Sequence, residues 1–108
     1  MNLRISEGHI RFRITREEMD VLMKDETVSF PLHLGSQVME YSIAQTESEQ
    51  PLTLDIQKTL WKLWVDKKSL HYFAASLPSR DGLEQDIVLG GSPLKLVLEV
   101  DVRRRQAA

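Results

Sequence analysis

The 108-residue sequence contains no cysteine, which excludes disulfides, thiol catalysis and thiolate metal sites. It has no apolar run approaching the roughly 18–20 residues that a membrane-spanning helix needs. The opening residues Met1 to Ile5 do not form the apolar centre of a signal peptide. A cysteine-free chain suits a reducing compartment. We therefore expect a cytoplasmic protein with no membrane partner.

Neither positive nor negative charge dominates, because the chain has 14 Lys and Arg residues and 16 Asp and Glu residues, and its formal net charge is −2. Dedicated nucleic-acid-binding domains normally carry a basic excess, so this balance argues against nucleic acid as the main partner. With 42% hydrophobic and 28% charged residues, the composition is typical of a folded domain rather than a disordered chain.

Two β-hairpins are predicted by apolar and polar residues that alternate with a period of two. Glu7-Gly8 forms the loop of the first hairpin. Gly35-Ser36 closes the second, and this register pairs the apolar residues of 28–34 with those of 39–43. Pro31 cannot donate to a strand ladder, so its strand is predicted to lie at a sheet edge or to carry a bulge.

Helices are predicted at two places. Thr15 and Glu18 fit a capping box for a helix that ends near residues 24–26. Apolar residues at helical spacing predict a second helix over about 57–67. The remaining expectations are strands at 52–56, 70–75, 87–89 and 94–102, and a loop at 77–85.

This order of elements predicts an α+β fold, with a mostly antiparallel sheet of six to seven strands and two α-helices. The two hairpins and the later strands supply the sheet. The long apolar strand at 94–102 is expected to be central. We expect one domain over residues 1–102, followed by a frayed basic tail at 103–108.

One polar face is a candidate site, because the first hairpin places Arg4 directly opposite Arg11. Like charges in that position are destabilising, so an anion should lie close by. Glu99 and Asp101 on the last strand would supply it internally, which is the usual situation on a charged sheet face. An external phosphate, carboxylate or nucleic acid is the alternative. The candidate anion-binding residues are Arg4, His9, Arg11 and Arg13.

No constellation of catalytic residues is evident, and the sequence favours a protein that is not an enzyme. His9, His33 and His71 fall on three predicted strands, but their spacing matches no zinc motif. There is no G-x-S-x-G elbow, and Gly90-Gly91-Ser92 lacks the lysine of a phosphate-binding loop. We therefore predict no catalytic residue, no metal site and no cofactor.

Trp61 and Trp64 are three residues apart, so a helix over 57–67 would make them neighbours on its surface. Both would then fill the core, which is the commoner role of tryptophan in a small domain. The alternative is that one of them is partly exposed and anchors a partner protein.

The opening stretch L-R-I-x-x-x-x-I-R-F-R-I-T-R-E-E, from Leu3 to Glu18, resembles the start of a family of short uncharacterised bacterial proteins. Members begin with a motif of the type R-x-R-x-x-x-I-R-x-R-L-T-x-x-E. The stretch from Leu52 to Trp64 and the L-K-L-V-L-E-V-D strand also fit. The resemblance implies a self-contained domain but no activity or cofactor. Members often have a cysteine after the last strand, where this chain has arginines after Val102.

The leading functional hypothesis is a small non-catalytic binding or regulatory module, whose partner is an unknown protein or a second copy in a homodimer. The first alternative is a small enzyme or anion-binding protein that uses the face of Arg4, Arg11, Arg13 and His9. The second alternative is weak nucleic-acid binding through the same face.

Overall fold

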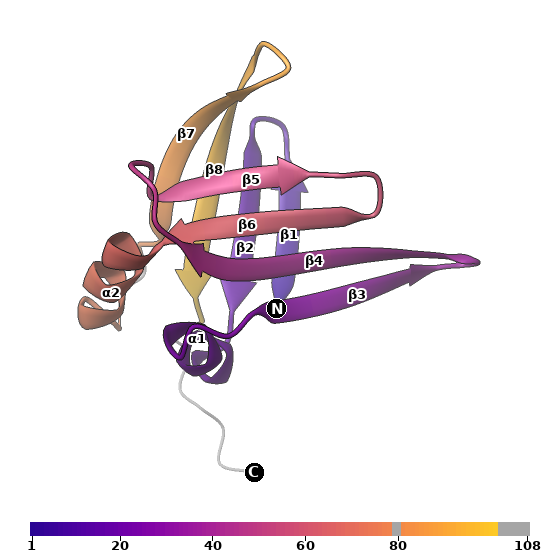
Figure 1. Cartoon of the computed structure of the whole chain (residues 1–108). Helices are drawn as coiled ribbons and strands as arrows, with labels where there is room; N and C mark the ends of the chain where they lie inside the picture. Colours follow the sequence, from indigo (N-terminus) through magenta and orange to yellow (C-terminus); the bar gives the residue numbers. More distant parts are fainter. Residues whose placement is uncertain (79–80, 102–108) are drawn as a thin grey trace.

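Two four-stranded sheets cross one another in the structure, a computed structural model that describes residues 1–78 and 81–101 (Figure 1). The strands are β1 (Asn2–Ser6), β2 (His9–Ile14), β3 (Val28–Leu34), β4 (Gln37–Thr46), β5 (Leu52–Ile56), β6 (Leu60–Asp66), β7 (Leu83–Leu89) and β8 (Ser92–Val100). The helices are α1 (Arg16–Met23) and α2 (Lys67–Ala75). The strand orders are β1-β2-β8-β7 and β3-β4-β6-β5.

The α+β class is confirmed, but the expectation of one mostly antiparallel sheet of six to seven strands is wrong. Each hairpin begins its own sheet, and each sheet then gains a parallel neighbour: β8 beside β2, and β6 beside β4. A hairpin pattern specifies only the pairing of strands that follow one another in the chain. It carries no information on which distant strand will pair with the hairpin's second strand.

Both predicted hairpin registers are confirmed, including Arg4 opposite Arg11 and Phe30 opposite Tyr41. Pro31 lies on β3, which is an edge strand, and β8 lies between two other strands as expected. The capping box is also confirmed. The Oγ1 of Thr15 accepts a hydrogen bond from the Glu18 amide at 3.0 Å, and the Glu18 carboxylate accepts one from the Thr15 amide at 2.9 Å.

The predicted helix at 57–67 and the predicted strand at 70–75 are both wrong. Residues 60–66 form β6, and α2 occupies 67–75. β6 has apolar side chains on both of its faces, because Leu63 is fully buried and Trp64 beside it is half-buried. A strand with apolar residues on both faces loses its alternation and is hard to tell from a helix. The predicted loop at 77–85 overlaps β7, which begins at Leu83.

One hydrophobic core joins both sheets and both helices. Phe12 and Leu98 from one sheet, Ile43 and Leu63 from the other, and Leu70 of α2 are all fully buried. The two helices lie at one corner of the crossed sheets, and the end of the β3–β4 hairpin projects beyond the first sheet (Figure 1). Neither helix in the described part of the chain is long and apolar enough to cross a bilayer. The predicted tail at 103–108 lies outside the described residues.

We expect alanine at position 63 to be much more destabilising than alanine at position 64. Leu63→Ala opens a cavity between the sheets and should lower the free energy of unfolding by about 2–5 kcal/mol. Trp64 lies on the outer face, where the Lys62 ammonium sits 4.3 Å from its ring centroid. Its replacement should cost on the order of 1 kcal/mol. Urea unfolding of both variants measures the difference, and equal losses would contradict the strand assignment.

Candidate functional site

The outer face of the sheet β1-β2-β8-β7 brings together all four residues of the predicted anion site. Side chains at paired positions of adjacent strands point to the same side of a sheet. Arg4 is paired with Arg11 across β1 and β2. His9 and Arg13 are the next outward-facing residues on either side of Arg11, because outward positions alternate along β2.

An internal counter-ion is present for two of the arginines. The parallel register sets Arg13 beside Glu99, whose carboxylate lies 3.1 Å from the Arg13 Nε and 3.7 Å from the Arg11 Nε. The Glu99 side chain is only 15% exposed. The Arg13 Nε has no aligned hydrogen bond among the described residues, so the contact is an ion pair only. One carboxylate therefore serves two guanidinium groups.

Arg4 is exposed, and within the described residues it forms no ion pair at 4.0 Å or less. Beside it lies a hollow of about 120 Å³. The residues that line the hollow are Arg4, Ser6, His9 and Arg11. Ser6 was missed by the sequence analysis, although the predicted register already paired it with His9. Asp101, the second acid proposed to neutralise this face, directly follows β8, where its amide donates to the Ile14 carbonyl.

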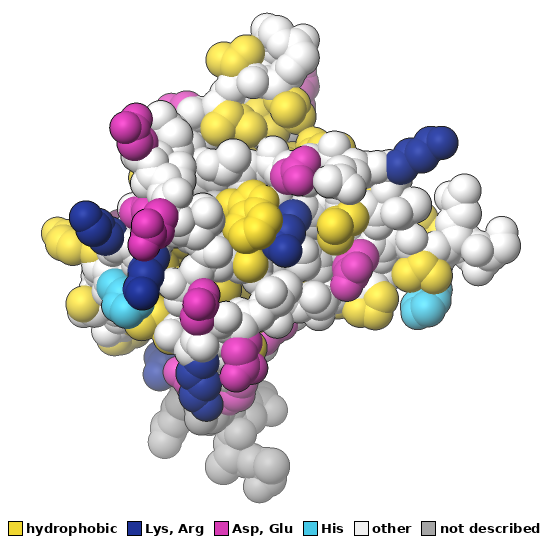
Figure 2. Space-filling model, in the orientation of Figure 1, with side chains coloured by type: hydrophobic (Ala, Val, Ile, Leu, Met, Phe, Trp, Pro, Cys, Tyr) yellow, Lys and Arg dark blue, Asp and Glu magenta, His cyan; other side chains and the backbone are white. Residues whose placement is uncertain are grey.

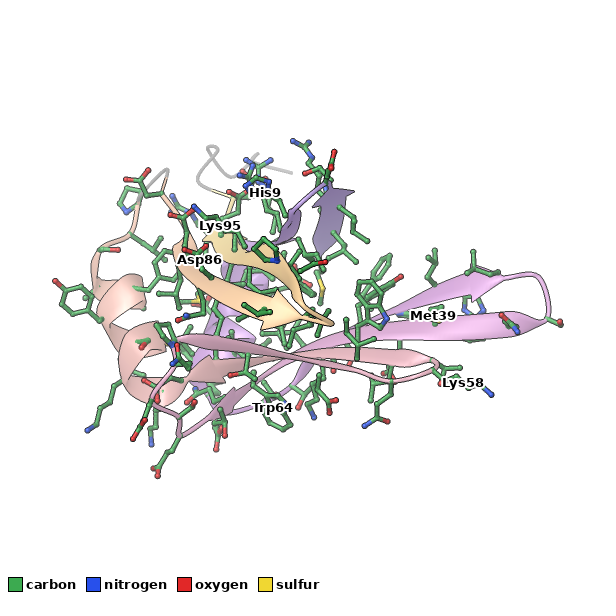
Figure 3. The ribbon with its side chains drawn as sticks, turned by 90° about the horizontal axis from the view of Figure 1, so that it is seen from above. His9, Met39, Lys58, Trp64, Asp86 and Lys95 are labelled. Carbon is green, nitrogen blue, oxygen red and sulfur yellow. The ribbon has the colours of Figure 1, made fainter. Side chains whose placement is uncertain are left out.

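The charge on this face changes from positive at β1 and β2 to negative at β7. Lys95 lies beside His9 on one side and is paired with Asp86 on the other. Figure 3 shows these three residues in succession along one side of the molecule. The Lys95 Nζ is also 3.9 Å from the Glu84 carboxylate. The acids of β7 thus balance Lys95, whereas the edge formed by β1 and β2 keeps an excess of positive charge.

Trp61 and Trp64 are not neighbours on a helix, so that part of the prediction is wrong. They lie on opposite faces of β6, because side chains separated by an odd number of residues alternate along a strand. Trp61 is half-buried and makes an edge-to-face contact with Tyr41 at 5.7 Å between ring centroids. The Tyr41 ring lies 6.2 Å from that of Phe30. The three rings form a row that continues the core toward the β3–β4 hairpin.

An apolar surface extends from this aromatic row along the projecting hairpin. Leu34 is 53% exposed and Ile56 40% exposed, although both occupy positions on the core-facing side of their sheet. We call this surface the apolar shelf. It consists of Phe30, Leu32, Leu34, Met39, Ile56 and Trp61. Figure 3 shows Met39, on the shelf, and Trp64 on opposite sides of the sheet.

The opposite face of this sheet has a different character. Figure 2 views it and shows separate hydrophobic groups among scattered Lys, Arg, Asp and Glu side chains. Isolated apolar side chains of this kind are normal on a protein surface, whereas a contiguous apolar patch is not. The shelf is therefore the more distinctive surface of the second sheet.

The three histidines do not come together. His9 lines the hollow, His33 lies on β3, and His71 lies on α2. Across residues 1–78 and 81–101, no group of three or more His, Asp or Glu side chains has the geometry to hold a metal ion.

A second hollow, of about 300 Å³, lies where β6 passes into α2. Its lining includes Asp66, which the sequence analysis did not single out. The Asp66 carboxylate accepts hydrogen bonds from the amides of Ser48 and Ser69, each at 3.1 Å, and from the Ser69 hydroxyl at 3.0 Å. The amide of Ser48, followed by that of Ser69, holds the pKa of Asp66 below its ordinary value. Asp66 therefore caps α2 and ties down the loop before β5.

Comparison with known proteins identifies one family. A family model described as "Family of unknown function (DUF7009)" matches residues 1–104. No curated protein matches the sequence.

Removing the shared carboxylate should weaken the fold through the arginines that it neutralises. Glu99→Gln leaves Arg11 and Arg13 adjacent without their counter-ion, and we expect the free energy of unfolding to fall by about 1 kcal/mol. Added salt should recover much of the loss, because it screens the repulsion between the two guanidinium groups. Urea unfolding at low and high salt measures both effects. A loss that does not change with salt would contradict this account.

The Asp66 cap should make stability depend on pH. Because the folded-state pKa of Asp66 is lowered, its contribution is complete above its ordinary pKa of about 4 and is lost as the pH falls through the folded-state value. Asp66→Asn should thus be less stable than the wild type at neutral pH, and the gap should narrow in acid. Denaturant unfolding from pH 7 to pH 2 tests this. Asp55→Asn controls for the change in net charge, and a constant gap would be the contrary result.

Proposed function

The chain belongs to the DUF7009 family of unknown function, and we propose from its geometry that it is a non-catalytic protein-binding module. Its recognition surface is the apolar shelf, and the occupant of the shelf is a second copy of the chain. The observation that carries this proposal is the exposure of Leu32, Leu34 and Ile56 at positions that face the core side of their sheet.

The shelf has the composition of a surface that a binding partner covers. The core-facing side of a sheet is normally buried against another layer. Here the first sheet covers only part of it, and the hairpin end of β3 and β4 carries the apolar pattern beyond that cover (Figure 3). Contiguous exposed apolar patches mark interaction sites. The half-buried Trp61 lies at the inner end of the shelf, and tryptophan is enriched among residues that dominate binding energy.

The absence of charge on the shelf favours a second copy as the occupant. A two-fold symmetric interface sets the same patch against itself, so any charged residue near the axis would meet its own copy. Every shelf residue is apolar, and Gln37 at the tip of the hairpin, paired with Leu34, is uncharged. Two shelves can therefore pack together without like-charge repulsion. A partner selected by charge would find no complementary group there.

Face-to-face packing fits the chain better than strand addition. Pro31 lies on the edge strand β3 and has no amide hydrogen to offer a strand that adds to that edge. The shelf, by contrast, offers side chains from all four strands of its sheet. The contact that we propose is thus a packing of two sheet faces, which is how sheets usually bury apolar surface.

The non-catalytic role is supported by the structural tasks of the polar residues. Thr15 and Glu18 cap α1, Asp66 caps α2, and Glu99 neutralises two arginines. Groups that are committed to capping and pairing in this way have full structural explanations.

A charged residue on the shelf should separate the two copies. We expect the wild type to be a dimer in sedimentation equilibrium and Leu34→Glu to raise the dissociation constant at least about tenfold, which is the effect of ~1.4 kcal/mol. Val38→Glu is the matched control, because Val38 is similarly exposed on the same hairpin but on the opposite face. Circular dichroism checks that both variants fold.

A wild type that stays monomeric up to several hundred micromolar would overturn the proposal of a second copy. Equal weakening by Val38→Glu and Leu34→Glu would also overturn it, since the shelf would then have no special role.

A further inference from the structure

The hollow at the β1–β2 edge has the donors of an oxyanion site. Arg4 and Arg11 are directly paired across the two strands, and Ser6 and His9 form the next pair toward the turn on the same face. All four line one hollow of about 120 Å³. At about 30 Å³ for each water molecule in the liquid, the hollow has room for a group the size of a few waters.

The charges around the hollow leave it positive. On the same face, Glu99 is shared between Arg11 and Arg13, so one negative charge offsets two positive charges. Arg4 adds a further positive charge and lies on an edge strand, with no neighbouring strand on its outer side.

Acidic groups near the hollow do not cancel this excess. Glu84 and Asp86 lie on β7, with β8 between them and β2, and Glu84 is in contact with Lys95. Glu7, in the turn above the hollow, is exposed and forms no ion pair among the residues that the structure describes. An arginine pair without a full set of counter-ions is the arrangement that a bound anion would complete.

We propose that this hollow binds a phosphate-type oxyanion between Arg4 and Arg11, with Ser6 and His9 completing its hydrogen bonds. The donors come from two adjacent strands and include two guanidinium groups, a hydroxyl and an imidazole. A planar carboxylate has two oxygens and one negative charge, and it would leave part of this set unused. A tetrahedral phosphate has more acceptor oxygens and up to two negative charges, and guanidinium forks match its geometry.

A single phosphate group fits this face better than a nucleic-acid backbone does. Beyond the hollow the face becomes mixed and then acidic, through Glu84 and Asp86 on β7. A strand of nucleic acid needs a continuous basic track, and the chain as a whole carries a net charge of −2. The hollow lies on the outer face of the sheet that does not form the shelf. The proposal is therefore independent of self-association.

Two-dimensional NMR of the full chain tests the proposal. The probes are inorganic phosphate, glycerol phosphate, acetate and a single-stranded oligonucleotide without terminal phosphates, all at one ionic strength. We expect saturable shifts of the Ser6 and His9 amides with both phosphates and weaker effects with acetate. Arg4→Gln should weaken phosphate binding about tenfold, the loss expected for one charge-assisted arginine contact. Arg16→Gln, an exposed arginine of α1, removes the same charge away from the hollow and should leave binding unchanged.

Equal affinity for the two phosphates supports a free-ion site, and tighter binding of glycerol phosphate supports a phosphorylated small molecule. No saturable shift with phosphate would overturn the proposal, as would equal affinities of the Arg4→Gln and Arg16→Gln proteins. Tighter binding of the oligonucleotide than of either phosphate would overturn it in favour of nucleic acid.

Discussion

The two crossed sheets bury each other's inner faces only in part, and the rest of the structure depends on this constraint. Phe12 and Leu98 on one sheet are fully buried against Ile43 and Leu63 on the other. Because the strands of the first sheet run across β3 and β4, the cover along the hairpin is set by the width of four strands about 4.8 Å apart, whereas the ten residues of β4 rise by about 3.3 Å each and extend further. The narrower first sheet cannot cover the whole length of the hairpin, so the apolar alternation that builds the core continues to Leu34 with no layer above it. The core and the shelf therefore belong to one alternating apolar pattern. Its residues form the core where the first sheet covers them and the shelf where it does not.

The parallel pairing of β8 with β2 determines the electrostatics of the opposite surface. In this register Glu99 lies beside Arg13 and Val97 beside Arg11, so the acid is displaced toward one end of the arginine cluster. It reaches Arg11 only at 3.7 Å. Arg4 is one strand further away, on the edge strand β1, and lies beyond this carboxylate. The positive hollow therefore follows from strand order and register together.

Local patterns in the sequence predicted the parts of the fold that depend on chain neighbours. The hairpin registers and the capping box of Thr15 and Glu18 are of this kind. The parallel pairings were missed because they join distant strands. β6 was taken for a helix because both of its faces carry apolar residues. Only the first part of β7, residues 83–85, was assigned to a loop, because Pro78, Asp81 and Gly82 precede it, whereas residues 87–89 were predicted as a strand. A Cβ built at Gly82 would lie 2.7 Å from the Leu98 carbonyl oxygen. That glycine permits a close approach of β7 to β8 rather than a turn.

The difference between local and long-range pairing also explains how much of the site was predictable. Arg4 and Arg11 face each other through a local register, so the sequence located them, and Glu99 as a counter-ion of Arg11 followed once the last strand was placed beside the hairpin. The shelf depends on the relative extents of two sheets, which no local pattern contains. The hollow and the shelf lie on different sheets, with the packed core between them. Coupling between two sites requires an element with two arrangements that both ligands can bias. A close-packed core resists such a change, so an anion in the hollow and a partner on the shelf should each bind without altering the affinity of the other.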